Sequence, residues 1–351
     1  MSGIKRGYVR PLDLKHGRVD MSHGAGGRAM AQLIGELFAR HLGNAYLGQG
    51  DDGAVLPPPP ADHALVMATE SHVVSPLVVA GGDIGCLSVH GTINDVAVMG
   101  ATPLYLSAAF ILEEGFALAD LARIVVSMAE AARGAGVPVV TGDTKVVEQG
   151  KGDGVFITTT GVGALPPGRR VGGARACVGD AILVSGTLGD HGVAIMSQRE
   201  NLGFEAPIVS DTAALHGLIA ALFASGADLH VLRDPTRGGL AATLNEIAAQ
   251  SGVGMMLDER AIPVKPVVNA ACEFLGLDPL TIANEGKLIC ICADADAERV
   301  LAALRQHPLG VDAMRIGTVI ADDHQFVQLR TRLGGTRIVD WLAGDQLPRI
   351  C

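Results

Sequence analysis

Residues 166–173, Pro-Pro-Gly-Arg-Arg-Val-Gly-Gly, interrupt the chain near its middle with a concentration of proline, glycine and positive charge. This composition is typical of a linker between domains. At 351 residues the chain is longer than an average domain, and each side of the linker is long enough to bury a core of its own. We therefore expect two units of mixed helix and strand, one α+β and one α/β.

The part before the linker, residues 45–165, has the pattern of a compact α+β unit. The predicted strands are residues 65–69, 104–112, 137–147 and 154–163, and the predicted helices are residues 84–99 and 117–132. Apolar residues recur along the second helix at the helical period and predict one buried face.

Residues 1–44 form an N-terminal extension in which Gly26 and Gly27 precede a helical pattern. Backbone N–H groups at such a helix start can bind an anion. A Gly-rich helix start is also compatible with an ordinary turn, so the residues alone leave both interpretations open.

The part after the linker, residues 174–330, alternates strands and helices. Strands are predicted at residues 181–185, 287–292, 316–320 and 326–329, with helices at residues 240–249 and 297–304. Cys290 and Cys292 are two positions apart on an apolar strand, which favours one buried face over a ligand role.

Residues 331–351 contain several glycines, no clear periodicity and a cysteine at the last position, and predict an irregular, flexible tail. Pro348 cannot join a helix or a central strand, so the Cys351 thiol is expected at the end of a mobile arm. About 20 extended residues span about 65 Å, enough to reach a cleft in the same or a neighbouring subunit.

The composition excludes several classes of protein. The net charge of −10 argues against a nucleic-acid partner, because phosphate backbones are bound mainly by clustered Lys and Arg. No apolar run reaches the roughly 20 residues of a membrane span, and the polar first residues lack a signal-peptide pattern. We expect a cytoplasmic protein whose six cysteines, which include no CxxC pair, stay reduced.

Short acidic motifs recur next to Gly, Asn, Thr or Pro, at positions predicted to end strands or helices. These residues are Asp51, Asp52, Asp95, Asp143 and Asp234. Carboxylates presented from loops could converge on Mg²⁺, which prefers oxygen ligands and keeps phosphate oxygens in its shell. Asp beside Gly also simply forms turns. Neither a GxxxxGK[ST] loop nor a strand followed by GxGxxG is present, so ATP would need a different architecture.

Taken together, these stretches resemble the PurM-like (AIR synthetase-like) ATP-binding superfamily and, within it, the hydrogenase maturation factors of the HypE carbamoyl dehydratase family. The resemblance runs over residues 23–27, 51–54, 89–100, 141–147, 234–239 and 284–287, and its most specific element is the ending Pro-Arg-Ile-Cys. Selenophosphate synthetases would carry a reactive residue near the N-terminal glycines, and thiamine-phosphate kinases lack the terminal cysteine. Glu70 and Cys86 depart from the Asp and Lys expected at these positions.

The resemblance implies a two-domain PurM-like fold in a homodimer that pairs through the N-terminal domain, with ATP and Mg²⁺ in the cleft between domains. The five aspartates named above match positions that hold metal and phosphates, and Gly26, Gly27 and Thr144 complete the nucleotide-binding set. Cys351, Glu285 and Lys145 match catalytic positions.

The resemblance further implies that a carbamoyltransferase, HypF, loads Cys351 with a carbamoyl group. ATP-dependent dehydration would turn this thiocarbamate into a thiocyanate, whose cyanide passes to iron on a HypC–HypD complex. Glu285 is the preferred base and Lys145 the second candidate. The alternatives are an ATP-dependent phosphotransferase acting on a free small molecule and a non-enzymatic thiol carrier. Whether the tail reacts in its own subunit or across the dimer stays open.

Overall fold

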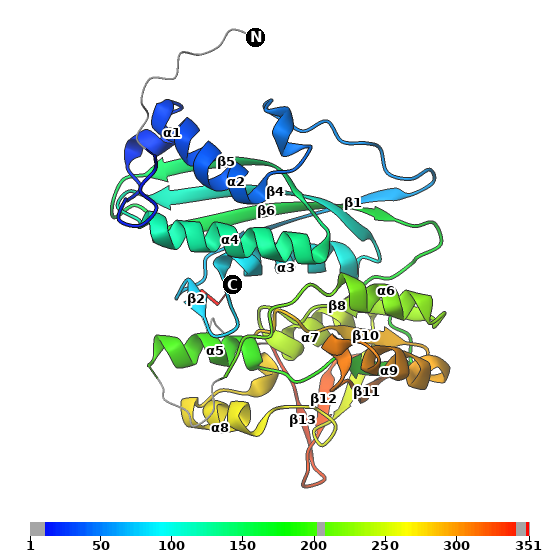
Figure 1. Cartoon of the computed structure of the whole chain (residues 1–351). Helices are drawn as coiled ribbons and strands as arrows, with labels where there is room; N and C mark the ends of the chain where they lie inside the picture. The colour runs from blue at the N-terminus through cyan, green and yellow to red at the C-terminus, as the bar shows by residue number, and fades with distance from the viewer. Residues whose placement is uncertain (1–10, 202–207, 342–348, 351) are drawn as a thin grey trace.

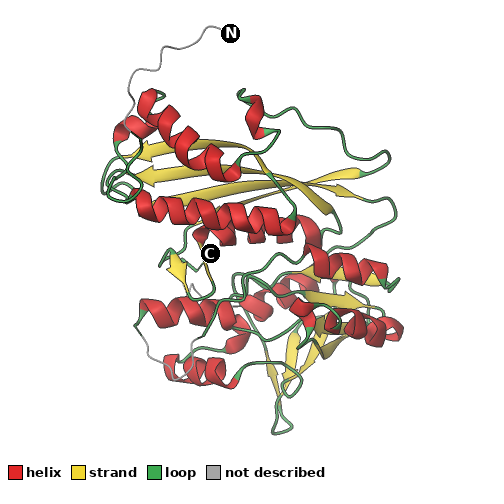
Figure 2. Cartoon of the chain, viewed as in Figure 1, coloured by secondary structure: helices red, strands yellow, loops and turns green. Residues whose placement is uncertain are grey.

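The computed structural model describes residues 11–201, 208–341 and 349–350. Each half of the chain builds its own sheet (Figures 1 and 2). The first half has a four-stranded sheet in the order β1 (Ala64–His72), β6 (Val155–Leu165), β4 (Thr102–Glu113) and β5 (Val139–Val147). β4 and β5 are parallel, whereas β6 is antiparallel to both of its neighbours. The four strands lie where the sequence predicted them.

Helices cover one face of this sheet. α4 (Leu118–Ala135) buries the stripe of Leu118, Leu121, Val125 and Met128 and ends at Gly136, whose φ of 69° is the left-handed cap that glycine adopts easily. Residues 28–42 form a third helical segment at the β5 edge, composed of α1 (Arg28–Leu33), a π-helical stretch (Ile34–Phe38) and α2 (Ala39–Leu42). The ring of Phe38 packs on Phe110 of β4, with 4.9 Å between centroids.

α3 (Ile84–Val98) is apolar on nearly every side and lies between the two domains (Figure 1). A helix that is apolar all round must be buried all round. One side packs on β1 and β6, and the other side meets α6 (His216–Ala224) of the second half.

The second half has a seven-stranded sheet in the order β13-β12-β9-β11-β7-β10-β8. Its strands are β7 (Ala181–Val184), β8 (Leu229–Arg233), β9 (Gly254–Asp258), β10 (Ile289–Cys292), β11 (Met314–Ile320), β12 (Val327–Arg330) and β13 (Thr336–Ile338). The helices are α5 (Asp190–Arg199), α6, α7 (Gly239–Ser251), α8 (Pro266–Leu275) and α9 (Ala297–Arg305). β12 and β9 are parallel, and the other pairs are antiparallel.

Both faces of the second sheet are buried, and the period of two along the strands divides its residues between two cores. On β10, Ile289 and Ile291 enter the core under α7, whereas Cys290 and Cys292 enter the core under α6 and α9. Both cysteines are fully buried, which confirms the expected common buried face.

The prediction of an irregular tail from residue 331 was wrong for its first part. Thr336–Ile338 form β13, which pairs antiparallel with β12. Val339 is buried, and its carbonyl accepts a hydrogen bond of 2.9 Å from the Asn245 side chain. The glycines at 334 and 335 therefore form a hairpin turn, which a search for helical or alternating periodicity does not detect. Among the described residues, no helix is long and apolar enough to cross a bilayer.

Candidate active site

Four carboxylates from both domains gather beside α3. Glu70 lies on β1, Asp95 on α3, Asp234 directly after β8, and Glu285 before β10. A cleft of about 570 Å³ opens next to them, lined by residues 65–68, by Asp95 and Asp234, and by the guanidinium groups of Arg233 and Arg237.

Close packing of the backbone brings Glu70 to α3. Gly91 of α3 faces β1, and a Cβ at this position would lie 2.3 Å from Glu70 Oε2. Glycine therefore leaves the space that the carboxylate occupies.

Asn284 aligns the two loops of the second domain. Its side-chain amide donates to the Pro235 carbonyl (3.1 Å), and its backbone N–H donates to the same carbonyl (3.0 Å). Its side-chain oxygen accepts from the Gly189 N–H at 2.8 Å. The loop with Asp234 and the loop with Glu285 are thus held side by side.

The four carboxylates have few partners. Glu285 is 1% exposed, and neither of its carboxylate oxygens has a hydrogen-bond partner. Glu70 Oε2 also lacks one, although it lies 3.3 Å from His72 Nε2. Burial raises the pKa of Asp234 to about 7, with repulsion from Asp95 adding to the effect.

The same causes act on the other members of the cluster. Burial, followed by the charge of Glu70, raises the pKa of Asp95 to about 6 and raises the pKa of Glu285 well above its usual range. Buried like charges with unpartnered oxygens are costly unless a cation neutralises them. The donor set is all oxygen, which fits Mg²⁺.

A second polar group lines a different cleft of about 640 Å³, between residues 28–42, the loop 50–53 and β5. Asp51, Asp52, Asp143 and Thr144 line it, and the two loop aspartates are exposed. Asp143 accepts a hydrogen bond of 2.9 Å from Lys145 Nζ, and this bond lowers the pKa of Asp143.

Gly26 and Gly27 are exposed at the start of α1 and are not among the residues that line these two clefts. The structure thus places them in the helix start that the sequence predicted, without a described contact to either acidic group.

The two groups lie at opposite edges of the first sheet. Glu70 pairs with Thr159 of β6, Thr159 with Ala108 of β4, and Ala108 with Gly142 of β5. Three strand spacings separate the ends of this row, about 14 Å. Within one chain the structure therefore brings Asp95, Asp234 and Glu285 together, but it does not bring Lys145 or the other three aspartates to them.

The end of the described chain lies near the segment that precedes Glu285. Cys351 lies outside the described residues, but Ile350 is 3% exposed and belongs to an apolar cluster with Val74, Ile195 and Ala283. We call this buried position of Ile350 its seat, and the sequence did not predict it. The sequence also did not single out Asp211, whose carboxylate accepts the Glu285 N–H at 3.0 Å. Their sequence neighbourhoods carry no motif, and only the three-dimensional contacts identify them.

Cys177, Asp180 and His230 form another cluster of possible metal ligands, within 4.8 Å of one another. Asp180 already accepts hydrogen bonds from His230 Nδ1 (2.6 Å) and the Cys177 N–H (2.7 Å). These bonds explain the cluster as a turn at residues 177–180 whose Asp180 carboxylate also binds His230 of β8.

Comparison with known proteins places this geometry in a family. Residues 50–165 match the N-terminal domain of AIR synthase related proteins, and residues 178–330 match the C-terminal domain. The chain is 68% identical to carbamoyl dehydratase HypE of Cupriavidus necator over 352 residues, which cover all of both chains.

Two solved structures are similar over most of the chain. One is hydrogenase maturation protein HypE in complex with ATP, with a TM-score of 0.91 and 50% identity, covering 94% of this chain and 99% of that chain. The other is a HypE–HypF complex, with a TM-score of 0.78 and 48% identity, covering 88% and 99%. These matches confirm the predicted two-domain PurM-like fold, and the chain belongs to the carbamoyl dehydratase HypE family of hydrogenase maturation proteins.

Proposed function

We propose that this protein dehydrates a carbamoyl group carried on the Cys351 sulfur, using ATP, and releases a protein-bound thiocyanate. The observation that carries the proposal is the buried position of Ile350. Its carbonyl is bound by His191, which also contacts Ser210, and the neighbouring Asp211 binds the Glu285 N–H. Two features of relatives support it: one binds ATP, and one forms a complex with HypF.

The thiocarbamate oxygen attacks the γ-phosphorus of ATP, ADP leaves, and one N–H proton is lost, which gives an S–C(=NH)–O–phosphate. The C–O bond then breaks, the phosphate leaves with the carbamoyl oxygen, and the second N–H proton is removed as the C≡N bond forms. One thiocarbamate and one ATP yield one thiocyanate, ADP and phosphate.

Glu285 is the proposed base for the N–H protons. Burial raises the pKa of Glu285, and a carboxylate with a raised pKa is a stronger base than one at the surface. Lys145 is 63% exposed and lies on the far edge of the sheet within one chain, so it is the second candidate. Its charge fits a role in binding phosphate oxygens.

Asp95 and Asp234 would hold Mg²⁺ on one side of the nucleotide, with Glu70 as a further oxygen donor that sequence reasoning treated only as a departure. Asp51, Asp52, Asp143 and Thr144 would contact metal or phosphates on the other side. Mg²⁺, when bound, supplies positive charge that offsets the charge of the reacting phosphates. Gly26 and Gly27, at the start of α1, would contact phosphates through their backbone N–H groups.

We propose a homodimer in which the uncovered face of the first sheet meets its twin. On β1, Leu65 is 63% exposed and Met67 is 71% exposed, so a hydrophobic part of this face is open to a partner. Two sheets pack about 10 Å apart. A twofold axis parallel to the strands would set β5 of one copy opposite β1 of the other, and would bring Asp143 and Lys145 to the partner's acidic cluster.

The remaining partners follow from the carrier chemistry. HypF would load Cys351, and the thiocyanate would pass its cyanide to iron on a HypC–HypD complex. This chemistry requires a reduced thiol and ATP, conditions that the cytoplasm provides.

The test is the intact mass of the protein after incubation with the carbamoyltransferase, carbamoyl phosphate and ATP. We expect a carbamoyl adduct that becomes lighter by about 18 Da, one water, only when ATP is present. Cys351→Ala should show neither species. ATP hydrolysis with no adduct on the wild-type chain would refute the proposal and favour a phosphotransferase that acts on a free small molecule.

A further inference from the structure

The two described residues before Cys351 are held mainly through their backbone. The Arg349 carbonyl accepts hydrogen bonds from the Ser75 N–H (3.1 Å) and from Arg199 Nη2 (3.0 Å). The same guanidinium donates to the Ser75 carbonyl, through Nη2 at 2.6 Å and Nε at 3.1 Å. Arg199 therefore joins the loop after β1, the end of α5 and the tail. The Arg349 side chain also pairs with Asp153.

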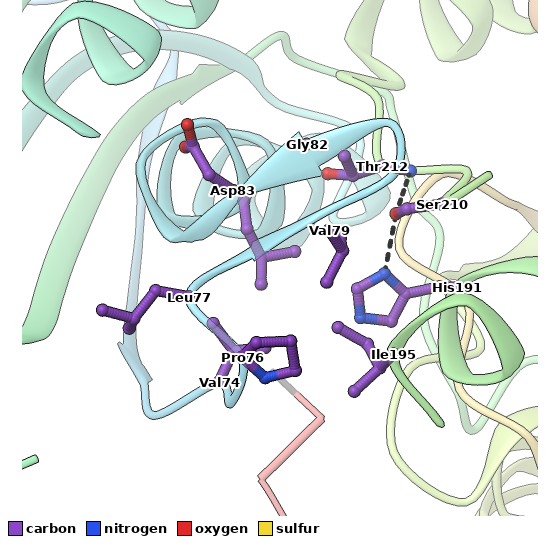
Figure 3. Close-up of a pocket in the computed structure, with 11 residues that line it drawn as sticks. Val74, Pro76, Leu77, Val79, Gly82, Asp83, His191, Ile195, Ser210 and Thr212 are labelled. Atoms are coloured by element: carbon purple, nitrogen blue, oxygen red, sulfur yellow. Dashed lines mark hydrogen bonds between the residues drawn. The ribbon is translucent and has the colours of Figure 1, made fainter. Parts of the chain in front are cut away.

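His191 of α5 holds the next carbonyl. Its ring is 1% exposed, and Nε2 lies 2.8 Å from the Ile350 oxygen. On the other side of the ring, Nδ1 lies 2.8 Å from Ser210 Oγ, which also accepts the Thr212 N–H at 3.2 Å (Figure 3). A carbonyl can only accept, so Nε2 carries the hydrogen. The serine hydroxyl can then donate to Nδ1, and both ring nitrogens are satisfied.

The segment that orients His191 also holds the proposed base. Asp211 follows Ser210 directly, and its Oδ1 accepts the Glu285 N–H at 3.0 Å. Asn94 of α3 donates to the Glu285 and Ala213 carbonyls, at 3.3 and 3.0 Å. A continuous series of hydrogen bonds and short chain segments thus joins the Ile350 carbonyl to the Glu285 backbone.

We propose that His191 is a positioning residue that fixes the Ile350 backbone, and with it the point from which the last residue extends, with Arg199 as a second anchor at Arg349. The inference rests on the proposed function, because it assigns Cys351 as the carrier of the carbamoyl group. The anchors bind backbone carbonyls and an apolar Ile350 side chain. None of these contacts therefore depends on the group that the next residue carries.

A purely structural role for His191 accounts less well for its contacts. Its Nδ1 contacts Ser210 of the second domain. The described hydrogen-bond partner of its Nε2 is the Ile350 carbonyl of the tail. If the tail leaves, a buried donor loses its partner unless water replaces it, which is unfavourable. The ring therefore favours the seated tail over a released one.

The first test measures the seat without any catalysis. The full-length wild-type protein and its variants are treated with iodoacetamide, and the rate at Cys351 is followed by peptide mass. Phenylalanine cannot donate a hydrogen bond to the Ile350 carbonyl, so His191→Phe should speed the alkylation of Cys351 by about tenfold. His191→Gln should restore most of the protection, because its amide nitrogen can donate from a similar position. Arg199→Met gives an independent variant with the same expected direction.

Val193→Ala is the matched control. Val193 lies on α5 and is fully buried, but it faces the cluster formed with α8 rather than the tail. It should weaken the packing of α5 and leave the alkylation rate near the wild-type value. An equal rise in Val193→Ala, or no rise in both His191→Phe and Arg199→Met, would overturn the proposal.

The second test separates positioning from nucleotide binding. In single turnover, the loaded His191→Phe chain should convert its carbamoyl adduct at least about fivefold more slowly, with unchanged ATP affinity, because only placement of the reacting group is lost. Equal conversion rates would refute the positioning role. If the wild-type chain forms no cyano adduct at all, the proposed dehydratase reaction fails, while the alkylation result still decides whether His191 seats the tail.

Discussion

Replacing Asp234 by asparagine should stabilise the ligand-free protein, and the gain should grow with pH. Asp234 is 8% exposed, and burial together with Asp95 raises its pKa from 3.8 to about 7. The folded chain therefore binds this proton more tightly than the unfolded chain does. The protonated Asp234 side chain therefore contributes stability that is fully present below about pH 4. This contribution is lost as the pH rises through about 7, where the folded chain must ionise Asp234.

The size of the stability gain in Asp234→Asn follows from the pKa shift of Asp234. At about pH 8, ionising Asp234 costs the folded state about 4 kcal/mol, because each pKa unit corresponds to about 1.4 kcal/mol. At about pH 5 the carboxyl is still protonated in the folded chain, and the cost is less than about 2 kcal/mol. Asparagine carries no charge at either pH, so Asp234→Asn should gain about 2–3 kcal/mol more at the higher pH.

The assay is urea unfolding, followed by circular dichroism in EDTA at both pH values. Asp51→Asn is the matched control, since it removes an exposed carboxylate outside the cluster. A stabilisation that is equal at the two pH values, or a destabilisation at the higher pH, would refute the account of a strained acidic cluster. Mg²⁺ should stabilise the wild-type protein and have a smaller effect on Asp234→Asn.

Three further predictions concern the acidic residues of the proposed active site and the base Glu285. Asp52→Asn and Asp234→Asn should each be inactive alone, but a mixture exchanged into heterodimers should recover about a quarter of wild-type activity, because half the dimers then hold one intact site; no recovery would contradict a site shared between subunits. Gly91→Ala should displace Glu70 and weaken Mg²⁺ binding by calorimetry, with an unfolding midpoint that does not fall, because the atom it meets at 2.3 Å is the end of a flexible side chain. Glu285→Gln should accept the carbamoyl group yet form no cyano adduct by mass; a cyano adduct would transfer the role of base to another group.

Much of the fold follows from local pattern. The strands and helices for which ranges were predicted lie within a few residues of those ranges, because the alternating and helical periods directly reflect buried faces. Besides β13, the α-helices and strands of the second domain without a predicted range are α5, α6, α8, β8 and β9. β13 was missed because it is three residues long and depends on pairing with β12 rather than on its own sequence. Pairing between strands is a tertiary property, which local propensity does not specify.

The site was predictable as a set of residues but not as an arrangement. Asp beside Gly or Pro marked most of the carboxylates, yet the strand order decides that Asp143 and Glu70 lie at opposite edges of one sheet. His191 and Arg199 gave no sequence signal, because a histidine and an arginine on a helix are usually unremarkable. Their importance depends on the carbonyls of Arg349 and Ile350, which are more than 140 positions away in the chain.

The buried amide of Asn94 has a consequence for motion. Besides its bonds to the Ala213 and Glu285 carbonyls, its oxygen accepts the Leu215 N–H at 2.7 Å. Swinging the two domains apart would break all of these bonds to a side chain that is fully buried between the domains. The protein should therefore not open and close as a hinged clamp around its nucleotide. In hydrogen exchange, the amides of α3 and of residues 213–215 should open together, as one cooperative unit that spans both domains.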